Sequence, residues 1–163
     1  TPDEDTIAEI ARKGNKMLKE SGFEQYEVSA FSVPGEAAVH NLNYWEFGDY
    51  IGIGAGAHGK LTRDESIFRS QKTRMPSDYM VDPNVNLIEV DAKDITLEFL
   101  MNALRLTNGF ELKLYSERTG LNPENLGPFI DQALQRGFIE FDQNHLIPSE
   151  KGRDFLNDML LLL

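Results

Sequence analysis

A glycine-rich stretch constrains this chain more than any other part of its sequence. Residues 40–60 read HNLNYWEFGDYIGIGAGAHGK, with glycines at positions 52, 54, 56 and 59. Core packing alone does not account for a histidine, two asparagines and a Tyr-Trp pair ahead of those glycines. The run from 50 to 54 predicts a short buried strand. Its glycine-rich end lets a ligand approach the backbone closely, because no side chain stands in the way.

The same glycines match a nucleotide-binding motif in residue spacing, but not in the predicted structure around it. Gly54, Gly56 and Gly59 have the spacing of the dinucleotide fingerprint G-x-G-x-x-G. That fingerprint works only when a helix begins at the last glycine and meets the pyrophosphate. Residues 60–64, KLTRD, do not predict an amphipathic helix. We therefore interpret the match as accidental.

The net charge of the chain limits the classes of partner that it is expected to bind. The 163 residues include 16 Lys and Arg against 27 Asp and Glu, a formal charge of −11. Nucleic acids and anionic membranes attract positively charged proteins, so neither is an expected partner. No apolar run approaches the ~18 residues of a membrane span, and no signal peptide is visible. A cytoplasmic setting is the expectation.

Cysteine is absent from the chain. This excludes disulfide bonds and thiolate metal sites within these residues. The length suits one domain, or two small domains that share a boundary.

The first part of the chain predicts an α/β unit. The opening Thr1-Pro2-Asp3-Glu4 is typical of a helix cap, and apolar spacing predicts a helix over about 3–21. Strands are predicted near 26–31 and 50–54, whereas 60–91 is predicted to be irregular. Two strands are too few to close a sheet, and the chain starts on a helix cap without methionine. We therefore expect a piece of a longer protein.

From about residue 93 the pattern changes to a winged-helix arrangement. Apolar spacing predicts a helix that ends near Asn108, a second over 112–118 and a third that starts at Asn122. A hairpin over 138–147 and a last helix capped by Ser149 follow. The expected domains are thus 1–92 and 93–163. Residues 92–163 hold 7 basic and 11 acidic side chains, a net of −4, so DNA binding through this domain is not expected.

Three histidines are candidates for chemistry. His40 is predicted to lie in a loop, and its neighbours Asn41, Asn43, Tyr44 and Trp45 offer hydrogen-bond donors and flat rings that suit a planar ligand. The alternative is an ordinary surface histidine. His58 follows the glycine-rich strand, where binding groups gather in α/β folds, and its alternative is a hydrogen-bonded structural role. His145 is predicted to be only an exposed hairpin residue.

Several segments together resemble a known family. YEVSAF at 26–31, HNLNYWEFGDYIGIGAGAHGK at 40–60 and FRSQKTRMP at 68–76 are similar to the C-terminal half of the oxygen-independent coproporphyrinogen III oxidase-like proteins. These are radical S-adenosylmethionine (SAM) proteins, and HemW-type haem chaperones are the most similar type. The resemblance extends from residue 2 to residue 163. It implies an α/β plus α+β fold, with the last strands and helix of a partial (β/α) barrel followed by a winged-helix-like domain.

The resemblance also implies cofactors. Proteins of this family hold a four-iron four-sulfur cluster through a CxxxCxxC motif near the N-terminus, and SAM binds the open iron. A chain without cysteine cannot hold that cluster, so these 163 residues alone are expected to be catalytically inactive and no cofactor is certain in them. Ala57 and His58 match the strand end that flanks SAM in the oxidases, and they are the expected SAM contacts.

Haem is the other ligand that the resemblance implies. His40, Asn41 and Tyr44 match the HNxxY motif of the chaperone type, which is linked there to haem binding, with His40 as the expected ligand of the haem iron. Arg69, Lys72 and Arg74 belong to a basic stretch and are expected to pair with the haem propionates. The alternative for that stretch is a solvated loop that offsets the acidic surface.

Function thus stays open between three possibilities for the intact protein. The HNxxY motif favours haem binding and trafficking, with haem or a porphyrin and a haem-accepting protein as partners. Oxidative decarboxylation of coproporphyrinogen III to protoporphyrinogen IX, as the family's common name says, is the alternative. A scaffold or interaction module without catalysis is the third possibility. The oligomeric state is not predicted.

Overall fold

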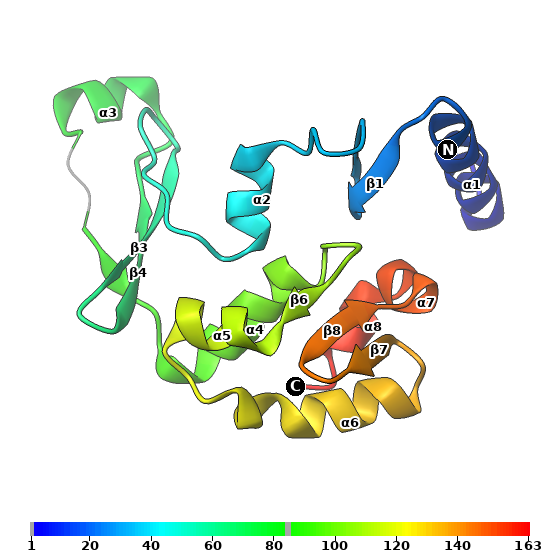
Figure 1. The fold of residues 1–163 in the computed structure, drawn as a ribbon. Helices are drawn as coiled ribbons and strands as arrows, with labels where there is room; N and C mark the ends of the chain where they lie inside the picture. The colour runs from blue at the N-terminus through cyan, green and yellow to red at the C-terminus, as the bar shows by residue number, and fades with distance from the viewer. Residues whose placement is uncertain (1, 84–85) are drawn as a thin grey trace.

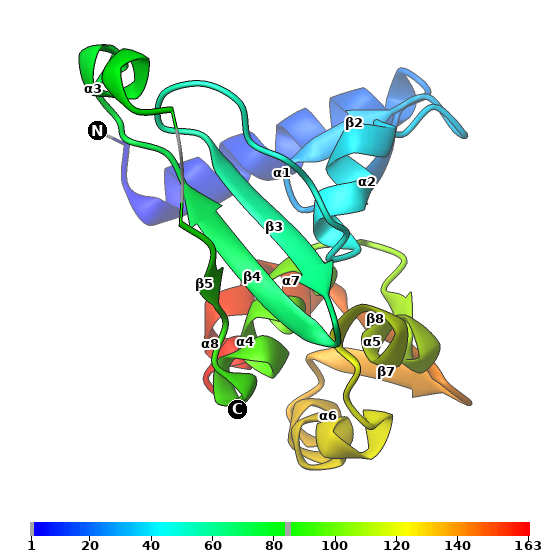
Figure 2. The same ribbon diagram turned by 90° about the vertical axis from the view of Figure 1, so that its left-hand side faces the viewer.

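The computed structural model describes residues 2–83 and 86–163, with only the backbone described at Glu4. An N-terminal helix and small hairpin, a short helix and a long hairpin lie on one side of a compact helix-and-sheet unit (Figures 1 and 2). The elements of the first part are α1 (Glu4–Glu20), β1 (Glu24–Glu27), β2 (Ala30–Ser32), α2 (Val39–Trp45), β3 (His58–Arg63), β4 (Ser66–Gln71), α3 (Pro76–Val81) and β5 (Ile88–Glu89).

The helix-and-sheet unit follows at residue 92. Its elements are α4 (Ala92–Ala103), β6 (Phe110–Glu111), α5 (Leu112–Thr119), a 3-10 turn η1 (Pro123–Leu126), α6 (Gly127–Gln135), β7 (Ile139–Asp142), β8 (His145–Pro148), α7 (Glu150–Asp154) and α8 (Leu156–Leu160). The described strands form three small antiparallel sheets, in the orders β1-β2, β3-β4-β5 and β6-β8-β7.

The N-terminal helix is confirmed, but its predicted cap is wrong. Asp3 is the N-cap, and its carboxylate accepts a hydrogen bond of 2.8 Å from the backbone N–H of Thr6. Thr1, the predicted cap, lies outside the described residues. Apolar side chains of the helix remain in solvent, since Ile7 and Ile10 are 51% and 61% exposed. Amphipathic spacing therefore produced the helix without giving it a buried face.

The single strand predicted near 26–31 is confirmed only in part, because residues 26–27 end β1 and residues 30–31 begin β2, with a turn at Val28 and Ser29 between them. The side chain of Glu27 accepts hydrogen bonds from the Ser29 N–H (3.0 Å) and hydroxyl (3.1 Å), which stabilises the turn at Val28 and Ser29. The Val28 N–H is directed away from the hairpin and donates to the carbonyl of Arg105. A local side-chain acceptor thus replaced the expected continuous strand.

The predicted buried strand over 50–54 is also wrong. Only Tyr50 pairs there, in an isolated bridge with Lys60, while Ile51 and Ile53 are 76% and 85% exposed. Gly54 and Gly56 adopt φ values of 102° and 74°, which lie outside the extended region that a strand requires. The glycine-rich segment is an open loop.

Residues 60–91 were predicted to be irregular, and they instead contain the longest hairpin described. Strands β3 and β4 pair in register from His58 opposite Gln71 to Arg63 opposite Ser66. Asp64 and Glu65 form the two-residue turn with φ values of 51° and 65°. Positive φ at both positions matches the right-handed twist of the flanking strands. Because the turn residues are not the usual Asn-Gly or Asp-Gly pair, the sequence pattern did not predict this hairpin.

Several of the helices and strands predicted for the second part are confirmed. The helix over 112–118 and the hairpin over 138–147 are present as α5, β7 and β8. Helix α4 ends at Ala103 rather than near Asn108, because residues 105 and 107 form backbone hydrogen bonds with Val28 and Tyr26. The last predicted helix is divided at Phe155 into α7 and α8. The third predicted helix, expected to start at Asn122, begins as the 3-10 turn η1 and continues as α6.

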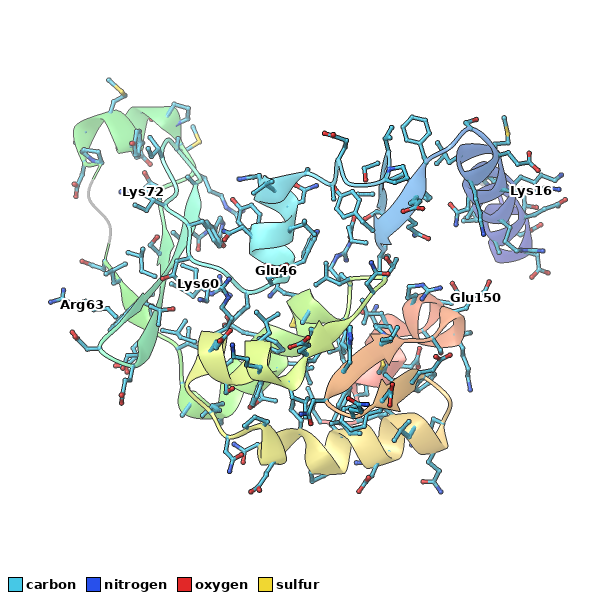
Figure 3. All side chains as sticks on the ribbon, viewed as in Figure 1. Lys16, Glu46, Lys60, Arg63, Lys72 and Glu150 are labelled. Atoms are coloured by element: carbon cyan, nitrogen blue, oxygen red, sulfur yellow. The ribbon has the colours of Figure 1, made fainter. Side chains whose placement is uncertain are left out.

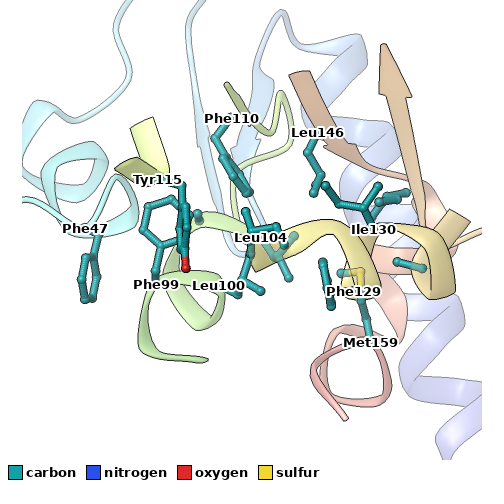
Figure 4. Close-up of a cluster of buried hydrophobic side chains, with 14 of the residues drawn as sticks. Phe47, Phe99, Leu100, Leu104, Phe110, Tyr115, Phe129, Ile130, Leu146 and Met159 are labelled. Atoms are coloured by element: carbon teal, nitrogen blue, oxygen red, sulfur yellow. The ribbon is translucent and has the colours of Figure 1, made fainter. Parts of the chain in front are cut away.

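A single hydrophobic core joins the two parts of the chain (Figure 4). Phe99 of α4 is fully buried, and its ring makes edge-on contacts with Phe47, Phe110 and Tyr115 at centroid distances of 5.1–5.7 Å. Phe47 belongs to the loop after α2, so the core extends into the first part of the chain. The buried side chains of the cluster are Phe47, Ile67, Ile95, Phe99, Leu100, Ala103, Leu104, Phe110, Tyr115, Leu126, Phe129, Ile130, Ala133, Phe138, Ile139, Leu146 and Met159.

Phe99→Ala tests the role of this core. Removal of a fully buried ring that contacts three others should lower the free energy of unfolding by about 3–5 kcal/mol. Phe155→Ala is the matched control, because Phe155 is 52% exposed and its loss should cost less than about 1 kcal/mol. Urea unfolding of both variants measures the difference, and equal losses would contradict this core assignment.

Candidate functional site

The HNxxY residues lie on a helix, not in the predicted loop. After the turn at Pro34 and Gly35, the sequence VHNLNYW forms α2 and places His40 and Tyr44 one helical turn apart. Their rings meet edge to face at a centroid distance of 4.6 Å, and the Tyr44 ring contacts the Tyr50 ring at 4.4 Å. The His40 side chain is exposed. The helix thus presents an imidazole in contact with the Tyr44 ring, which is itself in contact with Tyr50.

The neighbouring face of α2 is occupied by protein contacts. Asn41 and Trp45 are also one turn apart, about 100° around the helix from His40 and Tyr44. The Asn41 amide donates a hydrogen bond of 3.0 Å to the Tyr26 hydroxyl. The Arg105 guanidinium lies 4.4 Å from the centre of the Trp45 ring. Asn41 is therefore committed to a contact with β1, although its carbonyl oxygen stays available.

A buried ion pair fixes Arg105. The Glu27 side chain is 4% exposed, and one of its oxygens accepts hydrogen bonds from Nε and Nη2 of Arg105 at 3.2 and 3.0 Å. Nη2 also donates to the Ser29 hydroxyl at 2.9 Å. Because the carboxylate is satisfied by Arg105 and Ser29 together, its burial is compensated.

The buried cation Lys60 supports the loop after α2. The Lys60 ammonium donates to Asp49 (2.9 Å) and to the Thr62 hydroxyl (3.2 Å), and it lies 4.3 Å from the centre of the Phe47 ring. Lys60 is on the inner side of the β3–β4 hairpin, whereas Arg63 extends from its tip into solvent (Figure 3). Burial lowers the pKa of Lys60 below its ordinary value, against the opposing effect of Asp49.

The Asp49 carboxylate is the counter-charge of Lys60. Its partial burial, the largest single influence, would raise its pKa, but hydrogen bonds from Lys60 and from the N–H and hydroxyl of Thr62 together hold the pKa below its ordinary value of 3.8. These contacts join the loop after α2 to strand β3. Lys60 is therefore buried and paired, and it does not add to an exposed basic patch with Arg69, Lys72 and Arg74.

A cleft of about 620 Å³ lies between α2, the β3–β4 hairpin and α4. It contains His58 and Arg69 together with Trp45, Tyr50 and Arg105. Arg69 donates from Nε to Glu98 at 2.9 Å and from Nη1 to the Tyr50 hydroxyl at 3.3 Å. The indole N–H of Trp45 is buried, and among the described residues it has no hydrogen-bond partner.

The remaining predicted residues lie at the far end of the hairpin. Ala57 donates its N–H to the Gly54 carbonyl (3.2 Å) and accepts from the Lys72 N–H (2.8 Å), so both of its backbone groups are used. The Lys72 ammonium donates to the Pro83 carbonyl at 2.6 Å. Arg74 is exposed and has no ion pair within the described part of the chain. Arg69 and Lys72 thus have different partners.

Sequence reasoning missed the residues that support α2. Glu27 and Arg105 are 78 positions apart, and no local spacing links them. Glu27 did carry a weak signal, as a charged residue within an otherwise β-favouring run. In residues 2–83 and 86–163, no group of three or more His, Asp or Glu side chains is arranged to hold a metal ion. No helix of this part is long and apolar enough to cross a membrane.

Asp49→Asn tests the support of the loop after α2. Loss of the carboxylate leaves the buried Lys60 ammonium without its counter-charge, and the free energy of unfolding at pH 7 should fall by about 1–3 kcal/mol. Because folding lowers the pKa of Asp49, its contribution is present above pH 3.8 and is lost as pH falls through the folded value. The stability difference between the parent chain and the variant should therefore shrink in acid.

Urea unfolding at pH 7 and at pH 3 measures both effects. Asp64→Asn is the matched control, since the Asp64 side chain is 85% exposed in its pair with Arg63 and exposed pairs contribute little. A difference between the parent chain and Asp49→Asn that stays constant between the two pH values would contradict the assignment.

Comparison with known proteins agrees with the arrangement of elements. Residues 90–155 match the family described as the HemN C-terminal domain. The heme chaperone HemW of Escherichia coli (strain K12) is 40% identical over 99% of this chain and 43% of its own length. The mouse protein named radical S-adenosyl methionine domain-containing protein 1, mitochondrial, is 27% identical over 99% of this chain and 40% of its length.

A solved structure has the same mixed α/β fold. The coproporphyrinogen III oxidase HemN of Escherichia coli, described as a radical SAM enzyme, aligns with 99% of this chain and 41% of its own chain. Its TM-score is 0.67 at 13% sequence identity, so this likeness concerns the fold alone. The chain spans about 43% of the length of the HemW proteins that it matches. Over nearly its whole length the chain is therefore similar to the C-terminal part of coproporphyrinogen III oxidase-like radical SAM proteins, with HemW proteins among its relatives.

Proposed function

We propose that the intact protein binds haem and takes part in haem trafficking, as the names of its HemW relatives say of them. The single observation that carries this proposal is the face of α2 on which the exposed His40 imidazole lies against the half-buried Tyr44 ring. A neutral imidazole is a good axial ligand for haem iron. The neighbouring Tyr44 and Tyr50 rings offer an apolar edge for a macrocycle. Haem would supply its own iron, so the chain need contribute only this ligand and its surroundings.

Asn41 has a supporting part in this proposal. Its amide nitrogen holds Tyr26, which leaves the carbonyl oxygen as the group that could accept a hydrogen bond from a ligand. Of the three HNxxY residues, His40 and Tyr44 would thus contact haem, and Asn41 would mainly hold the helix.

The propionates of haem need cationic or donor groups. Arg74 suits this role best, because it is exposed and free of an ion pair in the described part of the chain. Arg69 and Lys72 already donate to Glu98 and to the Pro83 carbonyl, so either would have to share its remaining N–H groups with a propionate.

SAM and the iron–sulfur cluster belong to the proposal in different ways. The 163 residues contain no cysteine, so they do not fit the cluster, which would have to be held by other parts of the intact protein. The open loop before Ala57 and the exposed His58 side chain fit a SAM contact. Because the backbone groups of Ala57 are used, its contact would be through the methyl group.

The domain description is part of the same proposal. We assign 1–92 to the last portion of a partial (β/α) barrel and 93–163 to a winged-helix-like domain. The fold likeness to the solved oxidase supports the first assignment. The order of α4, α5, α6 and the β7–β8 hairpin supports the second. The net charge of −4 over 92–163 argues against DNA binding. A cytoplasmic setting and a haem-accepting protein partner complete the proposal.

Oxidative decarboxylation of coproporphyrinogen III is the second candidate function. The fold shared with the Escherichia coli oxidase supports it. The HNxxY residues on α2 favour haem binding instead. A scaffold without catalysis would leave the exposed His40 imidazole beside Tyr44 without a ligand.

His40→Ala tests the proposed axial ligand. Haem titration, followed through the Soret absorption band, should show a lost or altered spectrum for the variant, because the imidazole no longer reaches the iron. His145→Ala is the control, since His145 contacts the Asn108 carbonyl instead. If His40→Ala binds haem with an unchanged spectrum and affinity, the axial role is not that of His40, and His58 becomes the next candidate.

The absence of cysteine gives a second test. Anaerobic reconstitution of the purified chain with iron and sulfide should leave it without a stoichiometric cluster, because four-iron clusters of this kind need thiolate ligands. Iron and sulfide analysis provides the measurement. A bound four-iron cluster in this chain would overturn the assignment.

A further inference from the structure

We propose that Arg105 is a positioning residue for the haem-binding face of α2. It would hold the helix by stacking on Trp45 while Glu27 fixes its guanidinium. The functional consequence rests on the proposed haem function, whereas the structural part can be tested without haem.

Helix α2 cannot hold its own position. It has seven residues, no buried residue and no side-chain N-cap in the structure. Isolated helices shorter than about 12 residues are marginal in water, because nucleation is costly and few hydrogen bonds follow. The orientation of His40 must therefore be set by contacts with other elements.

Two contacts on one face anchor the helix. Near its start, the Asn41 amide donates to the Tyr26 hydroxyl at 3.0 Å. One turn later, the Arg105 guanidinium lies 4.4 Å from the centre of the Trp45 ring. Contacts at both ends of one face fix rotation about the helix axis as well as position. The adjacent face, with His40, consequently has a defined direction.

The two anchoring residues, Tyr26 and Arg105, lie on backbone segments that are linked to each other. The Thr107 N–H donates to the Tyr26 carbonyl (3.1 Å), and the Val28 N–H donates to the Arg105 carbonyl (3.0 Å). Tyr26 and Arg105 thus belong to two segments that are hydrogen-bonded to each other. The Glu27 carboxylate, between Tyr26 and Val28 in the sequence, adds the ion pair with Arg105. Movement of either anchor alone would break backbone hydrogen bonds.

The geometry requires arginine at this position. The guanidinium uses Nε and Nη2 for Glu27 and Ser29 and its flat face for Trp45 at the same time. A lysine ammonium carries the same charge, but it has no planar group to stack and no fixed fork of donors. Arg105→Lys therefore keeps the charge opposite the buried Glu27 and removes the geometry.

The first experiment compares Arg105→Lys with Arg63→Lys as the matched control, since Arg63 is exposed and remote from α2. Trp45 is the single tryptophan of the chain, so intrinsic fluorescence and its quenching by acrylamide report directly on this contact. Arg105→Lys should shift the emission maximum and increase quenching, whereas Arg63→Lys should change neither. Unchanged fluorescence in Arg105→Lys would overturn the stacking role.

Haem titration then tests the consequence for binding. Arg105→Lys should weaken haem binding about tenfold, which corresponds to about 1.4 kcal/mol, while the Soret maximum at saturation stays that of the parent chain because His40 is still present. His40→Ala should alter the spectrum itself. Parent-like affinity in Arg105→Lys, or an equal loss in Arg63→Lys, would overturn the positioning role.

Two substitutions of Trp45 keep the test valid if Arg105→Lys folds poorly. Trp45→Phe retains a ring for the guanidinium and should bind haem within about threefold of the parent chain, whereas Trp45→Leu should lose about tenfold. Equal affinities in the two variants would contradict the proposal. If the parent chain binds no haem, or His40→Ala binds it as the parent does, the proposed function fails, and the fluorescence result alone then supports or overturns the role of Arg105.

Discussion

The contact between Phe47 and Phe99 is the interaction on which the arrangement of this molecule depends. Phe99 is the centre of the core in α4, and Phe47 is the buried ring of the loop that follows α2. Through this pair the helix-and-sheet unit carries the segment with the candidate ligands. Phe47 occupies its position with a φ of 57°, a conformation that costs an L-residue roughly 1–2 kcal/mol. Burial of the ring offsets that cost.

Around this contact, cations link the elements to one another. Lys60 lies close to the Phe47 ring and joins β3 to Asp49. Arg69 joins the hairpin to Glu98 of α4, and Arg105 joins the end of α4 to Glu27 of β1. Each cation has one carboxylate partner on another segment of the chain. The elements around the candidate site are small, so these pairs supply the orientation that a large core would otherwise provide.

Local sequence patterns predicted the second part of the chain better than the first. Spacing and caps identified α5, the β7–β8 hairpin and the start at Ser149, because these elements bury their own apolar residues in the common core. A buried strand was predicted at 50–54 because Ile51 and Ile53 are apolar. In the structure, nothing in the described chain covers these two side chains. The turn at Val28 depends on Glu27 and on the carbonyl of Arg105, which is a contact between distant positions.

The candidate site was likewise predictable from the sequence only in part. His40 and Tyr44 were candidate ligand residues because of a motif, and the structure added that they share one face of α2, with His40 exposed and Tyr44 half-buried. The separate roles of Asn41 and Trp45 could not be predicted, since they depend on Tyr26 and Arg105. The prediction of a loop at His40 failed because this short helix lacks capping signals and owes its position to those tertiary contacts.

Local neutralisation of the three cations also has a kinetic consequence. Since Lys60, Arg69 and Arg105 each face a carboxylate, they present little positive charge near α2, and the chain as a whole carries a charge of −11. A doubly anionic ligand that diffuses toward α2 meets net repulsion, which acts mainly within the ~10 Å screening length of 0.1 M salt. Added salt should therefore accelerate its association, the opposite of the behaviour of proteins that attract polyanions.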